Sequence, residues 1–168
     1  SFSNASTRSI FASQLAALDT GSANLQRVGR RYGPELLAAA MARIQDQSEA
    51  AMRAMIAKIP DGTYQFEDFV DDDGIDRDIP LKVAVTLTVA GDGITIDLAG
   101  SSPQARGPVN CTLAMSHSGV MCGVMMALGE EIPANAGCYR PVTVSAPEGT
   151  VVNCLTPAPV ANRMATGH

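Results

Sequence analysis

Hydrophobic positions over the first third of the chain recur every three or four residues, which is the period of an α-helix. Between residues 10 and 28 this stripe is interrupted near Gly21, so we expect a first helix whose amphipathic pattern is broken there. Gly33 then ends the helical stretch, and Pro34 opens a second helix that runs to roughly Lys58. That second helix is predicted to bury one seam, made of Leu37, Met41, Ile44, Ser48, Ala51 and Met55.

After these helices the hydrophobic period changes to two, which indicates β-strands. Tyr64 and Phe66, with Asp68 as a further candidate, share one face of a first strand. Residues 81–89 alternate between apolar and polar, and residues 94–98 alternate again after an Ala-Gly-Asp-Gly turn. Two alternating runs around such a turn predict a β-hairpin.

Residues 113–129 form an apolar run in which Gly119 and Gly123 are four positions apart. We expect a helix there that is buried in the core or in an interface, with glycines that permit the close approach of another helix. A short strand and a Pro-Glu-Gly turn follow in residues 142–153. The predicted fold class is therefore α+β: an N-terminal helical hairpin, an antiparallel β-hairpin or sheet, and a buried apolar helix, in one domain over residues 10–168.

The composition fits a packed core, because 46% of the 168 residues are hydrophobic and the chain has the length of about one domain. The net charge of −5 is concentrated in residues 67–78, which hold seven carboxylates and one arginine. No basic stripe is present to bind a phosphate backbone, which disfavours nucleic-acid binding. No apolar run reaches the ~20 residues that cross a bilayer, so we expect no membrane association.

The four cysteines are spaced too widely for a zinc ribbon or a thioredoxin-like CxxC site. They are Cys111, Cys122, Cys138 and Cys154. A chain of this length does not need disulfides to fold, so we expect reduced thiols and a cytoplasmic protein. Residues 1–9 include Ser-Asn-Ala, a common remnant of tag cleavage, and we expect a tag or disorder there. The last ten residues lack terminating structure, as expected for a fragment of a longer polypeptide.

The acidic run 67–78 is the first candidate for a metal site. In an EF-hand loop aligned on Gly74, the first ligand position would be Phe69 and the last would be Pro80. Both lack a carboxylate, which argues against a calcium loop. We interpret the run as a solvated acidic connection between two strands, whose charges discourage pairing at the sheet edge.

The sequence gives little support for a catalytic nucleophile, because it contains no G-x-S-x-G elbow of a Ser/His/Asp hydrolase. His117 lies within the apolar helix, where a packed histidine is the preferred interpretation over a catalytic base. Cys111 and Cys138 lie in polar loops where a nearby cation could activate them, although packing roles are preferred.

Two loops rich in Gly, Pro and Asn carry the more suggestive polar side chains. "GPVNCT" places Asn110 and backbone N–H groups just before a helix, where such donors can meet a carbonyl or an oxyanion. "NAGCYRP" places Asn135 and Arg140, which can hold an amide or a carboxylate. The alternative is that these residues serve turn geometry alone.

Taken in order, several segments resemble the hydantoinase B/oxoprolinase family, which includes the B-type components of ATP-dependent N-methylhydantoinases, 5-oxoprolinases and a component of acetone and acetophenone carboxylases. These segments are "IPDGTYQFEDFVDDDG", "VTVAGDGITIDLAGSSPQARGPVNCT", "EEIPANAGCYRPVTVSAPEGTVVN" and "PAPVANRMATG". The resemblance covers nearly the whole chain from about residue 10. One departure is Leu98, which stands where the family usually has an aromatic residue.

The resemblance implies that this chain is part of a longer subunit of an enzyme that opens a cyclic amide, such as hydantoin or 5-oxoproline, at the expense of ATP. The carboxylase branch of the family, and a non-catalytic binding or assembly module, are the alternatives. The resemblance implies ATP and a divalent metal for the full enzyme, and a hydantoinase A-type partner that handles the ATP. The metal ligands of the carboxylase branch lie upstream of this segment, so we expect no cofactor site here. We also expect an oligomer. Asn110, Asn135 and Arg140 are candidates for holding or polarising the substrate, and Asp97 for orienting a neighbouring loop.

Overall fold

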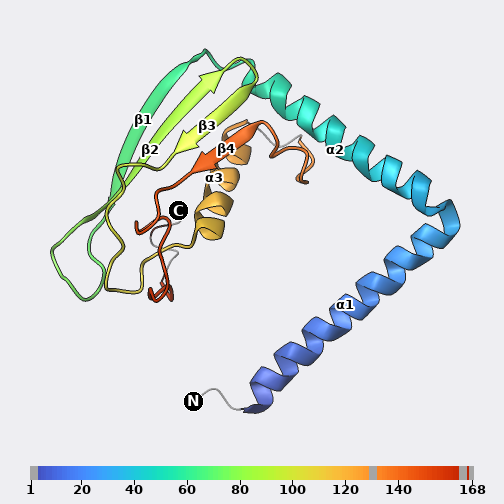
Figure 1. The fold of residues 1–168 in the computed structure, drawn as a ribbon, viewed down its shortest axis with the longest axis horizontal. Helices are drawn as coiled ribbons and strands as arrows, with labels where there is room; N and C mark the ends of the chain where they lie inside the picture. The colour runs from blue at the N-terminus through green and yellow to red at the C-terminus, as the bar shows by residue number, and fades with distance from the viewer. Residues whose placement is uncertain (1–3, 129–131, 163–165, 167–168) are drawn as a thin grey trace. The chain divides into compact units, whose positions relative to one another are not determined.

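The computed structural model describes residues 4–128, 132–162 and 166, and it divides the chain into two compact units (Figure 1). The first unit comprises residues 1–44 and the second comprises residues 45–168.

The first unit contains helix α1, Asn4–Tyr32, and the beginning of helix α2, Pro34–Ile56. The predicted boundary is confirmed: Gly33 has a φ of +82°, and α2 starts at the following proline. Helix α1 runs without a break through Gly21, where the amphipathic pattern is interrupted. A glycine in an exposed helix costs only about 1 kcal/mol relative to alanine and still makes its backbone hydrogen bond, so it weakens a helix without ending it. The helix also begins within the segment 1–9 that we expected to be a tag or disordered.

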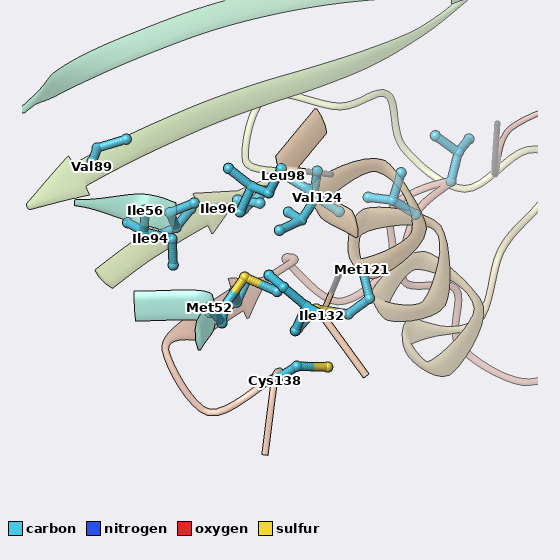
Figure 2. Close-up of a cluster of buried hydrophobic side chains, with 14 residues drawn as sticks. Met52, Ile56, Val89, Ile94, Ile96, Leu98, Met121, Val124, Ile132 and Cys138 are labelled. Carbon is cyan, nitrogen blue, oxygen red and sulfur yellow. The ribbon is translucent and has the colours of Figure 1, made fainter. Parts of the chain in front are cut away.

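The second unit begins with the C-terminal half of α2, whose buried residues are Ser48, Met52 and Ile56. The predicted seam is confirmed at Ser48, and its later members Ala51 and Met55 pack against the core but are only partly buried. Ser48, Met52 and Ile56 are four residues apart, so their side chains lie close to one face of the helix, and that face meets the core. Figure 2 shows Ile56 beside Ile94 and Ile96 of strand β3, Gly93–Asp97.

The four-stranded sheet has the order β1-β2-β3-β4 and comprises β1 Gly62–Val70, β2 Leu81–Ala90, β3 Gly93–Asp97 and β4 Val142–Ser145. Neighbouring strands are antiparallel except β3 and β4, which are parallel. The predicted hairpin is confirmed between β2 and β3, where Ala90 pairs with Gly93 and Gly91 takes a φ of +61°. The parallel pair was not predicted. It follows from the long crossover between β3 and β4, which includes a helix.

Helix α3, Leu113–Leu128, lies in that crossover. It buries one stripe of residues: Ser116, Met121, Val124 and Leu128. The opposite side stays open, and Met126 is 78% exposed. The predicted burial of this helix is therefore correct for one face only. The α+β fold class is confirmed.

The core of the second unit joins α2, the sheet, α3 and the loops after them. Its buried members include Met52, Ile56, Val89, Ile94, Ile96, Leu98, Met121, Val124, Leu128, Ile132, Cys138, Val142, Val151 and Val152. In the described part of the chain, no helix is long and apolar enough to span a membrane.

Candidate functional site

The acidic connection between β1 and β2 contains one carboxylate that is not solvated. Asp73 is only 4% exposed, although its neighbours Asp71 and Gly74 are exposed. Its Oδ1 accepts hydrogen bonds from the backbone N–H groups of Ile75 (2.8 Å) and Asp76 (2.6 Å), and its Oδ2 accepts one from the N–H of Gly107 (2.7 Å). The prediction of a solvated connection is therefore wrong for Asp73, because backbone donors of two loops replace its water.

This carboxylate fastens the acidic connection to the loop that precedes α3. A Cβ atom added at Gly107 would overlap the carbonyl oxygen of Asp73, so only glycine fits this close approach. Arg106 adds a salt bridge to Asp76 at 3.0 Å. The backbone hydrogen bonds from Asp76, Ile75 and Gly107 hold the pKa of Asp73 below its ordinary value of 3.8.

A pH-dependent contribution to stability follows from this lowered pKa. A group with a depressed folded pKa stabilises the protein above its unfolded pKa, and this contribution is lost as the pH falls through the folded pKa. We expect wild type to unfold at a higher urea concentration than Asp73→Asn at pH 7, and the difference to shrink as the pH falls below about 4. Urea unfolding between pH 7 and pH 3 measures it.

The matched control is Asp71→Asn, which removes the same charge from an exposed position of the same connection. Its unfolding midpoint should stay close to that of wild type at pH 7. A midpoint for Asp73→Asn equal to that of Asp71→Asn at pH 7 would contradict the role assigned to Asp73.

Asn110, a predicted site residue, is fully buried, and its amide is saturated with backbone partners. Its Oδ1 accepts a hydrogen bond from the N–H of Ala105 (2.7 Å). Its Nδ2 donates to the carbonyl oxygens of Ala105 (2.9 Å), Gly107 (3.0 Å) and Pro159 (3.0 Å). Asn110 therefore closes the loop before α3 and ties it to the C-terminal segment, downstream of the contact between Gly107 and Asp73.

Asn135 and Arg140 are brought together by one loop, which lies against the C-terminal half of α2. The Nδ2 of Asn135 donates to the hydroxyl of Ser48 (2.7 Å), and its Oδ1 accepts from the N–H of Gly137 (2.8 Å). The Arg140 guanidinium donates to three side chains of α2, each at 2.9 Å: Asp46, Glu49 and Gln45. Both predicted site residues thus hold the loop on a helix in this structure.

The charges around Arg140 extend into a network on the surface of the second unit. Glu49 also pairs with Arg53 at 2.7 Å, and Arg53 reaches Asp92 in the β2–β3 turn at 3.1 Å. The hydrogen bonds from Arg140 and Arg53 lower the pKa of Glu49, and Glu49 and Asp46 raise the pKa of Arg140. The network links α2, the sheet and the loop that carries Arg140.

Asp97, the fourth predicted site residue, ends β3. Its Oδ1 accepts hydrogen bonds from the N–H of Ala99 (3.2 Å) and from the hydroxyl of Ser145 on β4 (2.8 Å). It therefore shapes the start of the loop that leads to Asn110. The partners of Asp97 and Asn110 differ from those of Asn135 and Arg140, so the four residues do not share one set of contacts. Their catalytic role stays a prediction.

The candidate nucleophiles are placed differently from expectation. His117 is exposed on α3, not packed, because it lies away from the buried stripe of that helix. Cys111 and Cys138 are 1% and 0% exposed, so their reactivity in polar loops is not supported. The exposed thiol is that of Cys122. Within the described ranges, no cluster of His, Cys, Asp or Glu could hold a metal ion.

A cavity of about 530 Å³ lies between the sheet and α3. Its lining from β2, β3 and the residue after β3 is aliphatic: Val83, Val85, Leu87, Ile94, Ile96 and Leu98. The α3 side contributes Ser116, Gly119, Val120, Gly123, Val124 and Ala127. None of the described residues that line it is charged. The hydroxyl of Ser116 already donates to the carbonyl oxygen of Val152 at 2.6 Å, so the cavity offers few polar groups to a ligand.

Sequence reasoning missed the buried carboxylate of Asp73 and the open side of α3. The spacing Asp73-Gly74-Ile75-Asp76 is a usable signal for the first, because an aspartate often accepts backbone N–H groups two and three residues later. The glycines of α3 are a signal for the second, since they permit the close approach of another helix.

Comparison with known proteins places this architecture in a wider group. A putative D-/L-hydantoinase component of the B type from Pseudomonas sp. (strain NS671) is 33% identical over 170 residues, which cover 92% of this chain and 28% of that protein. The structure of an ATP-dependent caprolactamase from Pseudomonas jessenii superposes with a TM-score of 0.86 at 29% identity, over 96% of this chain and 28% of that one.

Acetone carboxylase, in a nucleotide-free structure, shares the fold with a TM-score of 0.72 at 19% identity, over 83% of this chain and 20% of that one. The chain thus spans 28% of the length of the hydantoinase component and of the caprolactamase, and 20% of that of acetone carboxylase. The profile of hydantoinase B/oxoprolinase matches residues 5–168, which include every element of both units except the first residue of α1. With the identity to the hydantoinase component, this match shows that the chain belongs to the hydantoinase B/oxoprolinase family.

Proposed function

We propose that the full-length subunit acts in the ATP-dependent opening of cyclic amides, together with a hydantoinase A-type partner that handles ATP. The observation that carries the proposal is the likeness to the ATP-dependent caprolactamase, at 29% identity and a TM-score of 0.86 over nearly the whole chain. The B-type hydantoinase component, 33% identical, supports the same chemistry. The carboxylase branch is supported by fold alone, at 19% identity.

The chemistry explains why ATP is needed. Resonance makes an amide carbonyl a poor electrophile, and an amide in an unstrained ring gains little from opening. Phosphorylation of the carbonyl oxygen would convert the ring into a better electrophile. The B-type component would then bind the activated ring and guide water to it.

For the four candidate residues, the hydrogen bonds favour positioning over direct chemistry. Asn110 and Asp97 shape the loop before α3, while Asn135 and Arg140 hold the following loop on α2. We propose that these two loops carry the backbone groups that face the substrate in the complete subunit. The described residues do not fit a metal ion, so we assign the divalent metal to another part of the enzyme. We further propose a cytoplasmic, oligomeric enzyme.

The test is an assay of the full-length subunit purified with its A-type partner. We expect ATP-dependent loss of hydantoin, 5-oxoproline or caprolactam, with ADP formed in step with ring opening, and no turnover without ATP. The 168-residue chain alone serves as a control and is expected to be inactive. Bicarbonate-dependent carboxylation of acetone without any ring opening would overturn the proposal in favour of the carboxylase branch.

A further inference from the structure

One face of the sheet is covered over part of its width and open over the rest. Directly paired residues point to the same face, so Phe66, which pairs with Val85, joins the face that α3 covers farther along the sheet. Ile94 and Ile96 of β3 are 4% and 3% exposed, whereas Phe66 of β1 is 70% exposed. The opposite face carries Thr86, Thr88 and Thr95 and suits contact with water.

The cavity of about 530 Å³ runs between α3 and strands β2 and β3, next to this open part of the sheet. On its α3 side, Gly119, Gly123 and Ala127 recur every four residues, so they form one small-residue ridge along the helix. A Cβ atom added at Gly123 would meet nothing within 4 Å. The described residues therefore leave the ridge unfilled at Gly123, and Met126 beside it is 78% exposed.

The chemistry of this groove, defined by its lining from β2, β3 and α3, restricts what can occupy it. A cyclic amide would bury its N–H and C=O groups against aliphatic side chains, and each unpaired group would cost several kcal/mol. An extended segment would do the same with its backbone. A helix satisfies its own backbone hydrogen bonds, and it can pack closely against a ridge of small residues while its large side chains fill the groove.

We propose that this groove binds an apolar helix from the part of the full-length subunit that lies outside these 168 residues. The length of chain available is large, because the hydantoinase component and the caprolactamase each have about 72% of their chains outside the matched region. A second helix beside α3 would complete the layer that covers the sheet, as layered α+β domains require. The proposal rests on the chain being part of a longer subunit and is independent of the reaction.

Thiol labelling tests the proposal with a native probe, because the exposed Cys122 lines the groove. We expect a maleimide to label Cys122 at least about tenfold more slowly in the full-length subunit than in the 168-residue chain, since labelling of a covered thiol follows the population of the open form. Phe66→Cys, read in both proteins, should show the same slowing on the β1 side. Thr95→Cys, on the opposite face, is the matched control and should react equally fast in both.

Equal labelling of Cys122 in the two proteins would overturn the proposal. The proposal would also be overturned if Cys122 of the 168-residue chain were labelled more slowly at higher protein concentration, because a second copy of the chain would then fill the groove. Slowing at Thr95→Cys as large as at Cys122 would also count against it, since the effect would not be confined to the groove. Enzymatic turnover does not enter these readings, so failure of the cyclic-amide proposal leaves them interpretable.

Discussion

Replacing Asn110 by aspartate is expected to destabilise the second unit by about 3 kcal/mol or more, although the two side chains have nearly the same shape. In the wild type, Nδ2 donates to the carbonyl oxygens of Ala105, Gly107 and Pro159. An aspartate oxygen at that place would face three acceptors without a donor, in a position that is 0% exposed. The carboxyl group must then either take up a proton or break the loop open.

Urea unfolding of Asn110→Asp, followed by circular dichroism at pH 7, measures this loss. Asn153→Asp is the graded control, because Nδ2 of Asn153 donates to one carbonyl oxygen, that of Ala146, and the residue is only partly buried. We expect the control to lose less stability than Asn110→Asp. If Asn110 instead has the predicted catalytic role, Asn110→Asp should leave urea unfolding unchanged and abolish turnover in the full complex. That result would show that the amide acts on the substrate.

Local features of the fold could be predicted from the sequence because they depend on residues close together in the chain. The alternation in 81–89 and 94–98 with a glycine at the turn specifies a hairpin, and Gly91 supplies the positive φ that the turn needs. Gly33 followed by Pro34 specifies a helix boundary for the same kind of local reason. By contrast, the parallel pairing of β4 with β3 depends on where a distant helix packs.

For the candidate site, the sequence predicted polar contacts but not the partners. Sequence reasoning selected Asn110, Asn135 and Arg140 because their groups can bind a carbonyl or a carboxylate. The structure shows Asn110 donating to carbonyl oxygens and Arg140 to carboxylates, whereas Asn135 contacts a hydroxyl and a backbone N–H. The partners are protein groups, which the residue types alone could not reveal. Asp73 was overlooked for a related reason: its spacing indicates the local N–H contacts with Ile75 and Asp76, but not that the same carboxylate also accepts from Gly107 of the neighbouring loop.

Gly137→Ala is the second substitution for which we expect a large effect. Its added Cβ would overlap the carbonyl oxygen of Gln45, and the backbone of α2 cannot yield there without disturbing the helix. The loop must move away instead, which would pull Asn135 from Ser48 and Cys138 from its fully buried place. We expect a loss of at least about 2 kcal/mol in the free energy of unfolding, because small-to-large changes at well-packed positions cost about 1–3 kcal/mol or more.

The control for Gly137→Ala is Gly123→Ala in α3, where an added Cβ meets nothing within 4 Å. Because alanine favours a helix over glycine by about 1 kcal/mol, this change should stabilise the 168-residue chain in urea unfolding. The same methyl group points into the groove assigned to a further helix, so the gain should shrink or reverse in the full-length subunit. If Gly137→Ala unfolds at the wild-type urea concentration, the loop is not held against α2 as the contacts of Asn135 and Arg140 require.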